Sequence, residues 1–447
     1  MIRFKTLRTF TPHFLALLIT LTLSFSNASL AMITTNGDLA LKLKNRPIES
    51  IIIKFNKKSS IKNLRQKIDL DLVKIQDLSN GTELFKIINP SLSALELDAK
   101  LEQLNSDPDI QYADPNLYAY IQKTPNDSRY TEQWHYYEEE GGMNLPEAWD
   151  MTTGSDQIVV GVVDTGIVKH GNIQDKILPG RNFVISKDDS NEADDPTDRG
   201  GDTSYHGTHV AGTIAATTDR NGTVSGVSWG AKILPVRVLD DSGSGSFAWI
   251  NEGMRWAAGI GKIENPNPAK IINLSLGGFG KCPKSLQETI DEIIAKDIII
   301  VVAAGNSSVN AKLFTPANCK GVITVAATNR NGKKTYYTNY GKEFVTIAAP
   351  GGEKDKNKDK ASDANKILSL ADLDNYQFLQ GTSMAAPHIS GLVALMYSLD
   401  PKLTHAQVVE YIKKGARGEE MEVGIADAKK TLELIKSKLP ENPENGE

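Results

Sequence analysis

The stretch Ile158-Val159-Val160-Gly161-Val162-Val163-Asp164-Thr165-Gly166 is an apolar run that ends in a carboxylate followed by a turn residue. A short apolar run of this kind is typical of a strand that is buried on both faces. A carboxylate at the end of a buried strand needs a partner, because burying it alone is costly. The stretch therefore predicts a central strand at 158–163, with Asp164 either in a functional site or capping a turn.

Further along the chain, apolar runs alternate with patterns of helical period. We expect strands at 233–238, 271–274, 298–304 and 322–326, and helices at 206–218, 247–260, 286–296 and 383–399. This alternation predicts an α/β fold, with a mainly parallel, doubly wound sheet and helices on both faces. Ligands of such sheets bind at the carboxyl ends of the strands, where Asp164 and Asn306 are expected.

Residues 49–118 carry a separate pattern of strand, helix, strand, strand, helix and strand, which favours a small α+β unit of the ferredoxin-like kind. The second of these helices begins with a capping box formed by Ser93 and Glu96. A polar segment rich in turn formers, 122–128, separates this unit from the rest. We therefore predict four parts: 1–31, 32–123, 124–439 and a disordered tail at 440–447.

The first 31 residues have the three-part pattern of a secretory signal peptide. Three basic residues precede an apolar stretch at 14–25, and small residues follow at 29 and 31. The apolar stretch is shorter than the roughly 20 residues that span a bilayer. We expect export and removal of 1–31 rather than a membrane anchor, with the periplasm or the medium as destination.

The composition narrows the class of protein. The chain has 447 residues, 40% of them hydrophobic, and a net charge of −5, so it is long enough for a large core and has no basic excess for binding nucleic acid. Its two cysteines, Cys282 and Cys319, suggest one disulfide in an exported protein, or two buried free thiols. Two thiols alone make a poor metal site.

Three side chains could form a nucleophilic centre. A serine hydroxyl is a poor nucleophile unless an imidazole takes its proton and a carboxylate orients that imidazole. Ser383 begins a helical pattern, where it could cap the helix or lie beside unpaired N–H groups that hold an oxyanion. His206 could serve as the base. His209 is close enough in sequence to suggest a metal pair instead, but no third ligand has a compatible spacing.

Three blocks resemble the signature blocks of the subtilisin-like serine proteases, the subtilase family: Asp164-Thr165-Gly166, His206-Gly207-Thr208-His209-Val210-Ala211-Gly212-Thr213 and Gly381-Thr382-Ser383-Met384-Ala385-Ala386-Pro387. Subtilisin itself is a standard example of this chain order of acid, base and nucleophile. The resemblance implies a serine endopeptidase in which Asp164 orients, His206 acts as general base and Ser383 is the nucleophile. It also implies that Asn306 donates to the oxyanion.

The resemblance further implies substrate-binding walls made by Ser275, Leu276, Gly277, Ala303, Ala304, Gly305, Gly243, Ser244 and Gly245. Glycines suit such walls because a second backbone must approach closely. Phe314 takes a place near the base of the first pocket where some relatives carry a smaller residue, so it would shorten that pocket. The unit at 32–123 resembles the inhibitory propeptide of these enzymes. This propeptide is expected to be cut near 119–125 and to be a binding partner of the enzyme. The enzyme is otherwise expected to be a monomer that acts on protein or peptide substrates.

An acidic stretch precedes His206. Carboxylates at this density repel one another without a counter-ion, and oxygen-rich loops suit structural calcium. The alternative is a solvated acidic loop, and the spacing does not fit an EF-hand. The carboxylates expected to bind calcium are Asp188, Asp189, Asp194, Asp195, Asp198 and Asp202. No organic cofactor is expected.

Two other classes of protein compete with a peptidase. An esterase of the α/β-hydrolase type needs Gly-x-Ser-x-Gly with its histidine after the serine, whereas Ala385 ends the motif here and His206 precedes Ser383. A non-catalytic binding or adhesion protein on the same scaffold would be expected to have lost a member of the triad. The sequence therefore favours a self-processing endopeptidase with the scaffold protein as its alternative.

Overall fold

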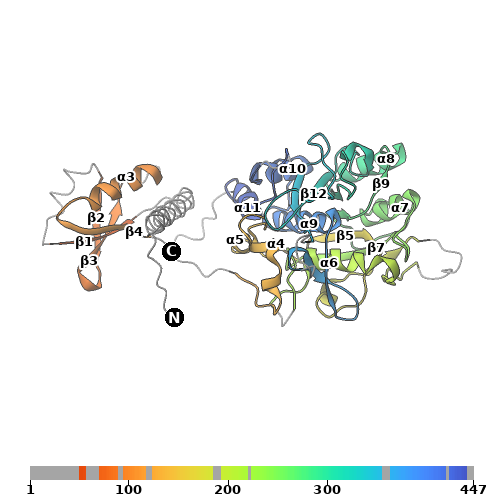
Figure 1. Ribbon diagram of the computed structural model, residues 1–447, viewed down its shortest axis with the longest axis horizontal. Helices are drawn as coiled ribbons and strands as arrows, with labels where there is room; N and C mark the ends of the chain where they lie inside the picture. Colours follow the sequence, from red (N-terminus) through yellow and green to blue (C-terminus); the bar gives the residue numbers. More distant parts are fainter. Residues whose placement is uncertain are drawn as a thin grey trace, which may run out of the picture. The chain divides into compact units, whose positions relative to one another are not determined.

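The computed structural model of the protein describes residues 50–56, 70–88, 94–116, 123–184, 193–219, 223–354, 363–418 and 422–439. The chain divides into two compact units, 1–121 and 122–447, drawn in Figure 1. Several expectations lie outside the described residues: the signal peptide, Ser93, the segment 117–122, Asp188, Asp189 and the tail at 440–447. No helix among the described residues is both long and apolar enough to cross a membrane.

The first unit contains an antiparallel sheet in the order β2-β3-β1-β4. Its elements are β1 (Ser50–Phe55), β2 (Leu72–Asp77), β3 (Thr82–Ile87), α3 (Ala94–Asn105) and β4 (Ile110–Pro115). Leucines of α3 pack with Ile51, Ile53 and Phe85 into one buried cluster. The sheet order is the one a ferredoxin-like unit has, but most of the helix expected before β2 lies outside the described residues, so this assignment stays a prediction.

The second unit is built on a seven-stranded sheet in the order β13-β12-β10-β8-β5-β7-β6. All its strand pairs are parallel, as predicted. The strands are β5 (Val159–Asp164), β6 (Arg181–Asn182), β7 (Lys232–Arg237), β8 (Ile271–Leu274), β10 (Ile299–Ala303), β12 (Ile323–Thr328) and β13 (Ile347–Pro350).

Helices cover both faces of this sheet (Figure 1). Successive residues of β10 alternate between two buried clusters, so that Ile299 and Val301 join one and Ile300 and Val302 the other. One cluster holds α4 (Trp134–Tyr137), α5 (Leu145–Trp149), α6 (His206–Ala215), α9 (Thr382–Leu399), α10 (His405–Gly415) and α11 (Ala428–Lys436). The other holds α7 (Phe247–Ala257) and α8 (Lys284–Ile294). The predicted α/β class is confirmed.

Two details differ from the sequence prediction. Helix α6 ends at Ala215 rather than at residue 218, because Ala216 leaves the helical conformation with ψ 140° and the amide of Thr217 donates to the Asn172 carbonyl 2.7 Å away. Two small antiparallel sheets were not anticipated: β9 (Gly278–Phe279) with β11 (Phe314–Thr315), and the hairpin of β14 (Ile367–Leu370) with β15 (Tyr376–Leu379).

The strand order positions the site. From β5 the chain first adds β6 and β7 on one side and then β8, β10, β12 and β13 on the other, so β5 and β8 flank the point where the order reverses. Ligands of open parallel sheets bind at the carboxyl ends of the strands at such a point. Asp164 ends β5, Ser275 follows β8, and Asn306 lies shortly after β10.

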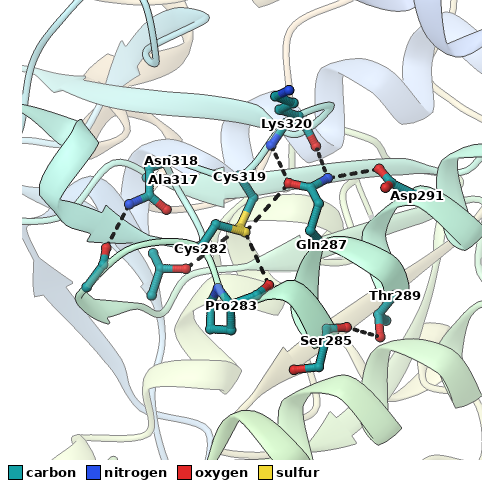
Figure 2. The surroundings of a disulfide bond; sticks show 12 residues. Cys282, Pro283, Ser285, Gln287, Thr289, Asp291, Ala317, Asn318, Cys319 and Lys320 are labelled. Carbon is teal, nitrogen blue, oxygen red and sulfur yellow. Dashed lines mark hydrogen bonds between the residues drawn. A yellow bond between two sulfur atoms is a disulfide. The ribbon is translucent and has the colours of Figure 1, made fainter.

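A disulfide joins Cys282 to Cys319, with the Cα atoms 5.2 Å apart. It links the turn before α8 to the segment after β11, and Figure 2 shows how Gln287 of α8 lies beside it. Gln287 donates to the Lys320 carbonyl at 3.1 Å and accepts from the Lys320 amide at 2.8 Å. The pairing suggested by the two cysteines is therefore present.

Candidate active site

The carboxylate at the end of β5 is paired with an imidazole. Oδ1 of Asp164 lies 2.7 Å from Nδ1 of His206 and also accepts the amide of Thr165 at 2.8 Å. The Asp164 side chain is 0% exposed, whereas that of His206 is 23% exposed. A buried carboxylate thus holds one edge of the imidazole, which leaves Nε2 as the nitrogen that can exchange a proton with a bound group.

The backbone before α6 sets the place of His206. Ser204 and Tyr205 both have left-handed φ values, 49° and 56°, so the chain turns sharply into the helix that His206 begins. Gly207 follows, and a Cβ there would collide with the Gly166 carbonyl oxygen after β5. A larger residue at 207 would push α6 away from the strand that carries Asp164.

The pKa of His206 reflects two opposing effects. Burial disfavours the imidazolium, but the charge and hydrogen bond of Asp164, with a smaller effect of Asp198, outweigh it and raise the pKa above 6.5. The site therefore stabilises the protonated imidazole that forms when His206 takes a proton.

Asp198 is a second buried carboxylate beside this pair, and its contacts are with the site rather than with solvent. It is 3% exposed, and its Oδ2 accepts the Thr165 hydroxyl at 2.5 Å while Oδ1 accepts the Gly200 amide at 3.0 Å. The Thr165 hydroxyl in turn accepts the Gly207 amide at 2.9 Å. Burial raises the pKa of Asp198 to about 6, and nearby Asp164 adds to this rise.

The sequence analysis did not anticipate this contact, because Asp198 lies among many acidic residues. The one signal that could have found it is Thr165. A hydroxyl placed directly after a buried carboxylate needs hydrogen-bond partners of its own.

Ser383 lies in the first turn of α9, directly after Gly381 and Thr382. Gly381 has φ 151°, which favours glycine, and brings the chain into the helix. Amides of a first helical turn lack helical partners, so the Ser383 N–H can bind an anion. The Ser383 hydroxyl donates to the Ser275 carbonyl at 3.0 Å, and no hydrogen bond joins it to His206 among the described residues. The hydroxyl must therefore rotate to reach the base.

The side chain of Asn306 is fixed by the residue before Ser383. Its Oδ1 accepts both the amide and the hydroxyl of Thr382, each at 2.9 Å. Because the carbonyl end of the amide is engaged in this way, Nδ2 is left to donate. A side chain at Gly381 would crowd this amide, since a Cβ there would lie 3.3 Å from that nitrogen.

Two predicted walls, one after β8 and one after β10, enclose the ring of Phe314. A Cβ on Gly277 would lie 2.5 Å from Cε1 of Phe314, and a Cβ on Gly305 would lie 2.8 Å from its Cδ1. Phe279, which is 68% exposed, packs edge-to-face on the ring with the centroids 5.8 Å apart. The ring therefore occupies space between the wall of Ser275, Leu276 and Gly277 and the wall of Ala303, Ala304 and Gly305.

The third predicted wall lies in an exposed loop after β7. Gly243 has φ 74°, and Asp240 accepts the amides of Ser242 and Ser244 at 2.9 and 3.0 Å. These bonds shape the loop through Gly245 without using any side chain of that segment. Its backbone is thus positioned by Asp240.

Three of the carboxylates expected to bind calcium have other partners among the described residues. Asp194 pairs with Arg181 at 3.2 Å, Asp195 accepts the Thr197 amide at 3.0 Å, and Asp198 is engaged with Thr165. No group of three potential ligands forms within the part of the chain that the structure describes. Asp188 and Asp189 lie outside the described residues, so structural calcium in this stretch stays a prediction.

His209 lies in the core rather than at the site. Its Nε2 is 3.1 Å from the Ile367 carbonyl, and burial lowers its pKa to about 3. Two more buried histidines are in contact: Nδ1 of His135 lies 2.7 Å from Nε2 of His388, whose own Nδ1 is 2.7 Å from the Met384 carbonyl. Since that carbonyl only accepts, His388 carries its proton on Nδ1 and accepts from His135. These three imidazoles are neutral parts of the packing.

Comparison with known proteins identifies the family to which this geometry belongs. The profile of the Subtilase family, a peptidase family, matches residues 155–434, which include Asp164, His206 and Ser383. The chain belongs to the subtilase family. The resemblance stated from the three sequence blocks is confirmed.

Individual subtilases show the extent of the likeness. The chain is 37% identical over 370 residues to an extracellular protease of Xanthomonas campestris pv. campestris, a match that covers 78% of this chain and 62% of that protein. It is 38% identical over 330 residues to an extracellular basic protease of Dichelobacter nodosus, covering 67% and 52%. The chain therefore spans between half and two thirds of the length of these relatives.

Solved structures of subtilisin-like proteases superpose on this chain. A protease of Pseudoalteromonas arctica superposes with a TM-score of 0.65 and 38% identity, over 70% of this chain and all of the other. A cold-adapted subtilisin-like serine proteinase superposes with a TM-score of 0.52 and 26% identity, over 67% of this chain and 97% of the other. The subtilisin-like fold is thus shared over most of the second unit.

Proposed function

We propose that the protein is a secreted serine endopeptidase that hydrolyses peptide bonds through an acyl-enzyme on Ser383. The observation that carries this proposal is the Asp164–His206 pair, with atoms 2.7 Å apart, at the same sheet edge as a serine in a first helical turn. Membership of a peptidase family supports it. Two relatives are named extracellular proteases, which supports export of this protein.

The proposed reaction has two halves, formation and hydrolysis of the acyl-enzyme. Oγ of Ser383 attacks the carbonyl carbon of the substrate while Nε2 of His206 takes the hydroxyl proton, and Asp164 stabilises the resulting imidazolium. The oxyanion accepts from Nδ2 of Asn306 and from the Ser383 amide. His206 then gives its proton to the leaving amine, the C–N bond breaks, and a water activated by His206 hydrolyses the ester.

The first unit is proposed to be an inhibitory propeptide that the enzyme removes by its own activity. The unit has a buried cluster of its own, which is what a separate folding unit requires. The polar segment 122–128 supports a cut near 119–125. Full-length chain carrying Ser383→Ala should persist where the native chain is processed, and persistence of the native full-length chain under folding conditions would contradict self-processing.

The space that Phe314 takes supports a preference for small side chains before the scissile bond. A ring that lies against Gly277 and Gly305 leaves little depth between the two walls. Cleavage of a peptide library, read by mass spectrometry, tests both proposals at once. Cleavage within peptides after small residues supports them, whereas cleavage mainly after large aromatic residues contradicts the specificity and absence of cleavage contradicts the endopeptidase.

A further inference from the structure

Helix α9 contains a proline one turn after the candidate nucleophile. In an α-helix each carbonyl accepts the N–H four residues later, but proline has no N–H and its ring presses on the carbonyl four residues earlier. For Pro387 that carbonyl belongs to Ser383. The carbonyl of Ser383 therefore has no partner within its own helix, and a buried carbonyl without a partner is destabilising.

Ser275 supplies the missing partner from outside the helix. Its hydroxyl donates to the Ser383 carbonyl at 2.8 Å, and its own carbonyl accepts the Ser383 hydroxyl at 3.0 Å. Ser275 is buried and follows directly on β8. The two serines thus form a reciprocal pair that ties the first turn of α9 to the end of a central strand.

The hydroxyl of Ser275 is itself oriented by buried neutral groups. Nδ2 of Asn273, in β8, donates to this hydroxyl oxygen at 2.9 Å, so the hydroxyl proton is directed to the Ser383 carbonyl. Oδ1 of Asn273 accepts the Ser390 hydroxyl at 2.9 Å, and Ser390 belongs to α9. Both Asn273 and Ser390 are fully buried. The chain of bonds starts and ends on α9 and passes through β8.

We propose that Ser275 is a positioning residue for the nucleophile: its hydroxyl replaces the helical N–H that Pro387 removes and holds Ser383 to the sheet edge that carries the rest of the site. Without Ser275, the first turn of α9 would be held by neither its own helix nor β8 at this carbonyl. This inference rests on the proposed function, since it assumes that Ser383 reacts. It differs from the predicted substrate-wall role, which needs only the backbone of Ser275.

The test compares the native full-length chain with its Ser275→Ala variant after processing, with kcat normalised to the sites titrated by the acylation burst. Loss of one buried hydrogen bond should lower kcat about tenfold. KM should change less than twofold, because the substrate-facing backbone is kept. Ser437→Ala is the matched control, since its hydroxyl donates to the Leu434 carbonyl of α11 at 2.9 Å, away from the site. Its kcat should equal that of the native enzyme.

A double-mutant cycle with Pro387→Ala separates positioning from a general structural loss. Alanine at 387 provides the helical N–H for the Ser383 carbonyl, so the variant carrying both changes should recover at least about threefold in kcat over Ser275→Ala alone. Ser390→Ala, at the end of the chain of bonds, should lose less than Ser275→Ala.

Four outcomes overturn the proposal. An active native enzyme with an equally active Ser275→Ala variant overturns the positioning role alone, as does a double variant whose loss is the product of the two single losses. A loss confined to KM assigns Ser275 to substrate binding instead. A native chain that turns over no peptide overturns the proposed function and the positioning role together.

Discussion

The first turns of α6 and α9 both position a reactive side chain, but the groups around them differ in charge. Each helix presents a reactive side chain in its first turn, His206 in one and Ser383 in the other. At α6 the surrounding groups include two buried carboxylates, Asp164 and Asp198. At α9 the described groups that hydrogen-bond to the first turn are neutral, and its side-chain partners include Ser275, Asn306 and His388.

The difference follows from the charge that each reactive group acquires. His206 becomes an imidazolium, so anions beside it lower the cost of proton transfer. The carbonyl attacked by Ser383 becomes an oxyanion, so a carboxylate beside it would oppose the reaction while N–H donors favour it. The comparison teaches that the site places its carboxylates beside the base and its neutral donors beside the nucleophile.

The largest expected effect comes from removing the charge at α6. Asp164→Asn should lower kcat by about 10⁴-fold, as the equivalent change does in other serine peptidases, because the amide selects the wrong imidazole tautomer. Steady-state kinetics on a peptide amide, with thermal unfolding to show that the fold is kept, measures this. A loss below tenfold would mean that the carboxylate at α6 is not needed.

The second-largest loss of kcat is expected from a change among the neutral groups at α9. Asn306→Ala should lower kcat by about 10² to 10³, the loss measured for the oxyanion asparagine of subtilisin, a member of the same family. KM and the pH profile should stay the same, because no charge changes and the ground-state carbonyl is not the group that Nδ2 binds. A shifted pH profile would break the contrast between the two helix starts.

A change in the predicted substrate pocket that touches no catalytic hydrogen bond should alter substrate preference rather than the rate of the chemical step. Phe314→Ala empties the space between Gly277 and Gly305. The ratio of kcat/KM for phenylalanine over alanine before the scissile bond should rise by about 10- to 100-fold. Matched peptide amides that differ only at that residue give this ratio, and an unchanged ratio would place the pocket elsewhere.

The smallest expected effect concerns the second carboxylate at α6. Asp198 raises the pKa of His206, so Asp198→Asn should lower that pKa. The base acts when neutral, and its pKa lies above 6.5, so the acid limb of kcat/KM should move to lower pH while the plateau stays within about threefold. Asp198 has its own pKa at about 6, so it is charged over most of that limb. An unmoved limb would show that Asp198 has no electrostatic part in the site.

The fold and the triad could be predicted from the sequence, but the side-chain contacts that hold the triad in place could not. Parallel strands at 158–163 and 271–274 follow from buried apolar runs, and the blocks around Asp164, His206 and Ser383 place those residues at strand ends and helix starts. Asp198 looked like a cation ligand because composition shows how many carboxylates a stretch contains but not which of them is buried.

The role of Ser275 could not be read from the sequence for a related reason. Pro387 in a helical pattern indicates that one carbonyl lacks its helical N–H partner. Only the packing of α9 on β8 shows which hydroxyl bonds to that carbonyl instead. The edge strands and the two small antiparallel sheets were missed because two to four residues are too few to show a periodic pattern.

The central claim is that Ser383 is a nucleophile activated by His206. Incubation of the full-length chain with a fluorophosphonate probe, followed by peptide mapping in a mass spectrometer, tests it most directly. The account predicts a covalent adduct on Ser383, absent in Ser383→Ala and strongly slowed in His206→Ala, with normal labelling of the Ser437→Ala control. An adduct on another serine, or equal labelling of Ser383 with and without His206, would contradict it.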